Sequence, residues 1–170
     1  MLKGYLAGPI ENQTINQACS WRVAASERFL GLVHFYNPMS GKENVASGRT
    51  KIRPDTYEPS LANLTNPSAI FGRDLAMIND ADFLLVCSLR ERVFSKGTMF
   101  EIGYAYAKDK LIVLVSKEPG IVEHPFLVRS CVIYPTLEDA YEFIESLARG
   151  FAERRADQLA LKEEESDESM

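Results

Sequence analysis

Five short apolar runs alternate with segments of helical spacing, and this alternation constrains the fold more than any other feature of the chain. The runs are Leu2–Ala7, Val33–Tyr36, Phe83–Cys87, Leu111–Val115 and Val132–Tyr134. Short apolar runs separated by helices are typical of buried strands in a parallel sheet, joined by right-handed crossovers. The sequence therefore predicts one α/β sheet of about five parallel strands.

The expected architecture is a flavodoxin-like, doubly wound sheet with helices on both faces and strand order 2-1-3-4-5. Ligands of such sheets bind beyond the carboxyl ends of the strands, where the strand order reverses. Here the Gly8-Pro9 turn, the residues after Cys87 and the helix that carries Glu101 would converge. We expect the functional site at this edge.

The stretch Ser95–Ala107 links the third and fourth predicted strands. Gly97 permits a turn, Thr98 is a good N-cap, and Glu101 stands three residues later, at the N3 position of a capping box. Two interpretations of Glu101 follow. It closes the capping box, or it is a catalytic carboxylate whose ionised form is favoured at a helix N-terminus. The pattern alone leaves both open.

Charge is placed unevenly along the chain. Of the net charge of −5, residues 151–170 supply seven acidic and three basic side chains, or −4. We expect one domain over residues 1–150, followed over 151–170 by a helix end and an acidic tail, disordered from about Lys162. The nearly neutral body argues against a nucleic-acid partner.

Metal and redox chemistry have little support in the composition. The three cysteines are scattered, there is no CxxC motif, and the two histidines lie far apart in the sequence. We expect neither a metal nor a cofactor. No signal peptide or membrane-spanning apolar run is present, so the sequence favours a cytoplasmic protein without a membrane partner.

The segment from Met39 to Thr65 is the least regular part of the chain. It contains a cationic cluster of Arg49, Lys51 and Arg53. A loop of this length in a compact domain is functional or else a disordered excursion, and the sequence leaves both alternatives open.

Three separated motifs together resemble the nucleoside 2-deoxyribosyltransferase family, which includes related N-glycoside hydrolases of nucleoside 5′-monophosphates. They are Tyr5-Leu6-Ala7-Gly8-Pro9-Ile10, then Arg73-Asp74-Leu75 with Asp80-Ala81-Asp82, and Gly97-Thr98-Met99-Phe100-Glu101-Ile102-Gly103-Tyr104-Ala105. The third motif is the most specific. The resemblance covers roughly residues 2–147.

This resemblance implies catalytic roles for three residues. Glu101 matches the nucleophile that attacks C1′ of the sugar, and Tyr5 matches the tyrosine that orients this carboxylate. Asp74 matches the aspartate opposite the nucleophile, near the leaving base. The alternatives remain that Tyr5 is an ordinary strand aromatic and that Asp74 is a surface carboxylate paired with Arg73.

Ser95 bears on the substrate. Six residues before the nucleophile, nucleoside-specific members of the family have aspartate and the nucleotide hydrolases have serine, so the resemblance implies a 5′-monophosphate. Ser95 could equally be a plain loop residue. The full set of expected substrate-binding residues is Gly8, Pro9, Ile10, Arg22, Ser95, Gly97, Thr98 and Ser130. Of these, Arg22 could hydrogen-bond a base, and Ser130 would reach the site of a neighbouring subunit.

The expected function is cleavage of the N-glycosidic bond of a 2′-deoxyribonucleoside or its 5′-monophosphate through a glycosyl-Glu101 intermediate. The deoxyribosyl group would pass to another base or to water, which the motifs do not decide. The alternative is a non-catalytic nucleotide-binding domain of the same fold. The resemblance also implies self-association, at least as a homodimer.

Overall fold

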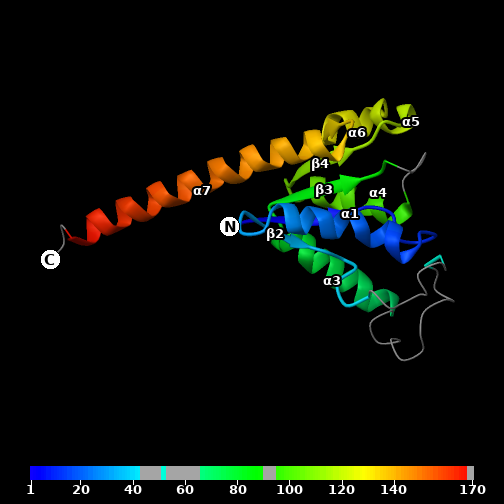
Figure 1. Ribbon diagram of the computed structural model, residues 1–170, viewed down its shortest axis with the longest axis horizontal. Helices are drawn as coiled ribbons and strands as arrows, with labels where there is room; N and C mark the ends of the chain where they lie inside the picture. Colours follow the sequence, from blue (N-terminus) through cyan, green and yellow to red (C-terminus); the bar gives the residue numbers. More distant parts are fainter. Residues whose placement is uncertain (43–50, 53–65, 90–94, 168–170) are drawn as a thin grey trace.

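The computed structural model describes residues 1–42, 51–52, 66–89 and 95–167 and contains one sheet of five parallel strands (Figure 1). The strands are β1 (Leu2–Ala7), β2 (Val33–Tyr36), β3 (Phe83–Cys87), β4 (Leu111–Val115) and β5 (Val132–Tyr134). Their order is β2-β1-β3-β4-β5, with every neighbouring pair parallel. The predicted strands and their order are confirmed.

Helices cover both faces of this sheet. They are α1 (Ile15–Arg28), α3 (Pro67–Asp80), α4 (Lys96–Tyr106), α5 (Pro119–Val122), α6 (Pro125–Ser130) and α7 (Leu137–Asp167). Side chains of α1 and α7 share one core with alternate strand residues such as Leu6 and Leu85. Side chains of α3, α4, α5 and α6 share the opposite core with Tyr5 and Leu84. Alternation along β1 therefore directs Tyr5 towards α3 and α4.

The start of α4 differs from the prediction. Ser95, and not Thr98, is the N-cap: the Thr98 backbone N–H donates to the Ser95 hydroxyl oxygen at 3.1 Å. Glu101 therefore lies in the second turn and has no part in a capping box. Serine is as good an N-cap as threonine, and capping from Ser95 adds three residues to the helix. The interpretation of Glu101 as a simple cap is wrong.

The C-terminal helix also differs from the prediction. α7 continues to Asp167 through the segment that we expected to be disordered from Lys162. Residues 151–158 are exposed, and this half of the helix projects away from the sheet (Figure 1). Alanine, leucine, arginine, lysine and glutamate dominate the segment, and all have high helix propensity. Propensity here outweighs the acidic composition that suggested disorder.

None of the helices described has both the length and the apolar character needed to cross a membrane. Within the same residues, His, Cys, Asp and Glu form no group of three or more that could hold a metal ion.

Candidate active site

A cavity of about 560 Å³ opens at the carboxyl edge of the sheet, where β1 meets β3 and α4 begins. It is lined by Gly8, Ile10, Glu11, Asn12, Met39, Lys42, Ile52, Ile70, Asp74, Ser95, Lys96, Gly97, Thr98 and Glu101. Seven of the expected site residues therefore line one cavity, and two of them are carboxylates, Asp74 on α3 and Glu101 on α4. The location is the one that the predicted strand order indicated.

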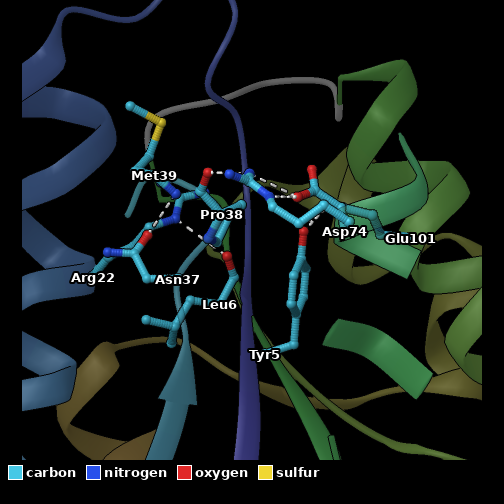
Figure 2. Close-up of polar contacts among 9 residues, drawn as sticks. Tyr5, Leu6, Arg22, Asn37, Pro38, Met39, Asp74 and Glu101 are labelled. Atoms are coloured by element: carbon cyan, nitrogen blue, oxygen red, sulfur yellow. Dashed lines mark hydrogen bonds and ion pairs between the residues drawn. The ribbon is translucent and has the colours of Figure 1, made fainter. Parts of the chain in front are cut away.

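Tyr5 and Glu101 are joined by a hydrogen bond. The Tyr5 hydroxyl donates to Glu101 Oε1 at 2.7 Å (Figure 2). The Tyr5 side chain is fully buried, and its pKa is raised well above the ordinary value. Burial is the largest cause, and the negative charges of Glu101 and Asp74 raise the pKa further. Tyr5 therefore stays a neutral donor and fixes one oxygen of the carboxylate.

The pKa of Glu101 is raised from 4.5 to about 7. Burial is the largest cause, and the negative charge of Asp74 adds to it, whereas the Tyr5 hydrogen bond and the Arg22 charge lower the pKa. The expectation that the helix N-terminus keeps Glu101 readily ionised is thus corrected, since burial outweighs it. A carboxylate with this pKa is a stronger nucleophile than an exposed one when it is ionised.

This shift predicts a pH-dependent stability effect for Glu101→Gln. Between the unfolded pKa near 4.5 and the folded pKa near 7, the native state binds more protons, so its stability falls as pH rises through that window. Glutamine abolishes this loss. We expect the variant to gain about 1–3 kcal/mol at pH 8 and little at pH 5 in urea unfolding. Equal changes in the free energy of unfolding at pH 5 and pH 8 would contradict the raised pKa of Glu101. The control is Glu138→Gln, at an exposed glutamate that is paired with Arg28.

Asp74 lies in the cavity wall and is also paired with Arg73. Arg73 donates to Asp74 Oδ1 from Nε at 3.1 Å and from Nη2 at 2.9 Å. The same guanidinium donates to the Pro38 carbonyl at 2.6 Å, which ties α3 to the turn after β2 (Figure 2). The two alternatives for Asp74 are therefore not exclusive, because the ion pair holds the carboxylate beside Glu101.

The first turn of α4 forms one wall of the cavity. Ser95, Lys96, Gly97 and Thr98 all line it. The Ser95 hydroxyl lies 2.8 Å from Thr98 Oγ1, besides capping the helix. The first backbone N–H groups of a helix have no intrahelical partner and attract anions. This wall thus combines hydroxyl groups, N–H groups and one lysine.

The turn after β1 contributes unequally to the cavity. Gly8 and Ile10 line it, whereas Pro9 lines a separate cavity of about 120 Å³ with Trp21 and Ser88. Gly8 has a φ of +153°, and a Cβ there would lie 2.8 Å from the Cys87 carbonyl oxygen. Only glycine lets β1 and β3 approach this closely at the cavity floor.

Two expected substrate-binding residues lie elsewhere. Arg22 has no exposed surface, because its guanidinium packs beneath the end of β1 and bonds backbone carbonyls, so the expectation that it contacts a base is corrected. Ser130 donates to the Phe126 carbonyl at 2.7 Å and lines a different cavity, between α4 and α6. Of the cationic cluster, Arg49 and Arg53 fall outside the described residues, and Lys51 does not line the cavity.

Lys42 is a cavity residue that the sequence reasoning missed. It is only 7% exposed, and its pKa is lowered, first by burial and then by the Arg73 charge, against the opposing effect of Asp74. The available signal was its place shortly after the end of the second strand, at the ligand-binding edge of the sheet. The cationic cluster of Arg49, Lys51 and Arg53, further along the loop, was the more obvious group of positive charges in the sequence.

Comparison with known proteins shows the family and the fold. The family model for nucleoside 2-deoxyribosyltransferase matches residues 5–142. A 2-deoxyribosyltransferase from Leishmania mexicana superposes with a TM-score of 0.59 at 19% identity, covering 84% of this chain and 96% of that one. A 2-deoxyribosyltransferase from the psychrotolerant bacterium Bacillus psychrosaccharolyticus gives 0.53 at 20% identity, covering 81% and 89%. No curated protein matches the chain.

The structural likeness shows a shared fold, and the family match extends over most of the chain. The matched range includes Asp74 and Glu101, which line the cavity, and Tyr5, which is hydrogen-bonded to Glu101. The chain belongs to the nucleoside 2-deoxyribosyltransferase family and is an enzyme.

Proposed function

We propose that this enzyme cleaves the N-glycosidic bond of 2′-deoxyribonucleosides or their 5′-monophosphates by way of a covalent glycosyl-Glu101 intermediate. The observation that carries the proposal is the 2.7 Å hydrogen bond from Tyr5 to Glu101 in a cavity that Asp74 also lines. A single carboxylate oxygen is held by Tyr5, which leaves the other to attack.

In the first step, the ionised Glu101 attacks C1′ of the sugar. The bond from C1′ to the base nitrogen breaks, its electron pair goes to the base, and an ester forms between C1′ and the carboxylate. Asp74, opposite the nucleophile, assists the leaving base by positioning it or by supplying a proton. In the second step, a base nitrogen or a water oxygen attacks C1′, the ester bond between C1′ and Glu101 breaks with its electron pair returning to the carboxylate, and the attacking base or water gives up a proton. The balance between transfer and hydrolysis depends on how well the occupied site excludes water.

The test is incubation with a panel of deoxynucleosides, ribonucleosides and their monophosphates, with and without a free acceptor base, followed by chromatography. Release of a base from any deoxy substrate supports the proposal. With a nucleoside, a new nucleoside in the presence of acceptor identifies transfer and free sugar identifies hydrolysis; with a monophosphate, the corresponding products are a new nucleotide and the sugar 5-phosphate. Binding without turnover over the whole panel would contradict the proposal and favour the non-catalytic nucleotide-binding alternative.

Asp74→Asn is expected to slow cleavage by about two orders of magnitude or more with little change in substrate affinity. The substitution keeps the side-chain shape and an acceptor for Arg73 but removes the negative charge opposite Glu101. Single-turnover rates and equilibrium binding measure the two effects separately. Asp80→Asn, further along the same helix and paired with Lys3, is the matched control. Turnover of Asp74→Asn equal to that of the control would remove Asp74 from the mechanism.

Self-association, at least as a homodimer, is part of the proposal. Beside the cavity between α4 and α6, several large apolar side chains are exposed, including Phe126 at 79% and Tyr106 at 59%. Apolar groups gathered in this way are typical of contact surfaces. We expect light scattering to give at least twice the monomer mass, and Phe126→Asp to lower it. Leu30→Asp, at an exposed leucine after α1, should not. A monomeric parent would contradict this part of the proposal.

A further inference from the structure

Arg22 is a fully buried cation that has no role in the reaction as proposed above. Its side chain has no exposed surface, and its guanidinium lies over the Trp21 ring, whose centroid is 4.5 Å from Arg22 Cζ. Among the described residues, no carboxylate oxygen comes within 4.0 Å of its guanidinium. A charge that is taken out of water without a close counter-ion is costly, so its position requires an explanation.

The guanidinium binds the end of β1 from below. Nε donates to the Leu6 carbonyl at 3.2 Å, Nη2 to the Gly8 carbonyl at 2.9 Å, and Nη1 to the Ala18 carbonyl. Leu6 and Gly8 flank Ala7, and Tyr5 is the residue just before them. The donors of Arg22 therefore fix the backbone between the tyrosine that holds Glu101 and the glycine on the cavity floor.

Three neutral donors could satisfy the same carbonyls, so hydrogen bonding alone does not account for a charged group. Burial lowers the pKa of Arg22, and the charges of Tyr5, Glu101, Cys87 and Cys19 oppose this effect; Glu101 is the carboxyl group among them. In Figure 2, Arg22 and Glu101 lie on opposite sides of the end of β1. The positive and the negative group thus lie on either side of one strand, and Arg22 has no exposed surface.

We propose that Arg22 is a positioning residue for the reaction: its guanidinium fixes the end of β1 and supplies the buried positive charge that balances the Glu101 carboxylate. This inference rests on the proposed function, because the charge matters for catalysis only if Glu101 reacts in its ionised form. The other groups that face Glu101 are Tyr5 from β1 and Asp74 from α3. Lys42 lines the same cavity as Asp74 and Glu101.

The test separates the charge of Arg22 from its hydrogen bonds. Arg22→Lys keeps the charge and loses the forked donors, whereas Arg22→Gln keeps a donor and loses the charge. Arg28→Gln, a surface arginine on the same helix paired with Glu138, is the control. The titration midpoint of Glu101 is measured by NMR in protein labelled with carbon-13 at glutamate Cδ, and the signal is assigned through Glu101→Gln.

We expect Arg22→Gln to raise the Glu101 midpoint by about 0.5–1.5 pH units and Arg28→Gln to leave it unchanged. The acid limb of kcat/KM should move by the same amount. Arg22→Lys should keep the midpoint within about 0.3 units and lower kcat by about tenfold to a hundredfold, with KM nearly constant, since the strand end is less well fixed. A folded Arg22→Gln with the parent midpoint would reduce Arg22 to a structural role.

If Arg22→Gln does not fold, Arg22→Lys decides the matter. A midpoint that rises by more than half a unit despite the retained charge, or a kcat equal to that of the parent, overturns the inference. The titration does not require turnover. The parent protein could prove inactive while the titration midpoint of Glu101 still depends on the charge at residue 22. That result would refute the proposed reaction but would support the electrostatic effect of Arg22 on Glu101.

Discussion

Glu101→Ala is expected to abolish base release, with a loss of at least four orders of magnitude in kcat, while the fold stays intact. Without the carboxylate, no covalent intermediate can form, and the remaining binding groups supply only a small part of the rate enhancement. Because Ser95 and not Glu101 caps α4, the substitution removes no helix cap. Base release at fixed substrate concentration and circular dichroism measure the two properties on the same sample.

The isosteric Glu101→Gln separates chemistry from packing, since glutamine can still accept the Tyr5 hydrogen bond. It should be as inactive as the alanine variant and at neutral pH more stable than the parent. Quenching the parent protein in acid during turnover tests the intermediate directly. A peptide containing Glu101 should carry the added mass of one deoxyribosyl group with a nucleoside substrate, or of one phosphodeoxyribosyl group with a monophosphate. Turnover of either variant within tenfold of the parent, with a native spectrum, would exclude Glu101 as the nucleophile.

The strand pattern allowed most of the fold to be predicted. All five strands were located correctly because each is a short apolar run bounded by turn residues, and parallel strands with helical crossovers permit few topologies. The predicted strand order also indicated the edge of the sheet at which the candidate cavity lies. The reversal between β1 and β3 brings Gly8 and the start of α4 together, although they are nearly ninety residues apart in the sequence.

The errors concern properties that depend on three-dimensional packing. Ser95 and Thr98 are both good caps, so the sequence pattern does not decide which of them caps α4. The same limit applies to Arg22, whose sequence neighbours give no indication that its guanidinium is enclosed beneath β1. The raised pKa of Glu101 also depends on burial, which outweighs the helix terminus that the sequence revealed. The spacing of residues along the sequence indicates which side chains share a face of a helix or strand, but not how deeply those side chains are buried.

The parent enzyme is expected to prefer a deoxynucleoside 5′-monophosphate to the matching nucleoside by about tenfold to a thousandfold in kcat/KM. The wall of the cavity at Ser95, Lys96, Gly97 and Thr98 offers hydroxyl groups, helix-start N–H groups and an ammonium group. Each charge-assisted hydrogen bond to a phosphate contributes about 1.5–3 kcal/mol, and desolvation of the dianion offsets part of the sum.

Ser95→Asp is expected to reverse this preference. Aspartate is an equally good N-cap, so α4 should keep its start, and only the charge at the cavity wall changes. The carboxylate repels a phosphate and offers an acceptor to a free 5′-hydroxyl. Ser95→Asn is the matched control, since asparagine has the same size and also caps helices but is neutral; it should keep the parent's preference for the monophosphate.

The measurement is kcat/KM for each substrate pair at two ionic strengths. Because the effect is electrostatic, added salt should reduce the difference between the aspartate and asparagine variants. If the aspartate and asparagine variants shift the ratio equally, then the size of the side chain and not its charge governs the choice. If the parent prefers nucleosides, or the ratio is the same in the parent and in Ser95→Asp, Ser95 serves only as a helix cap and nucleosides become the substrate class.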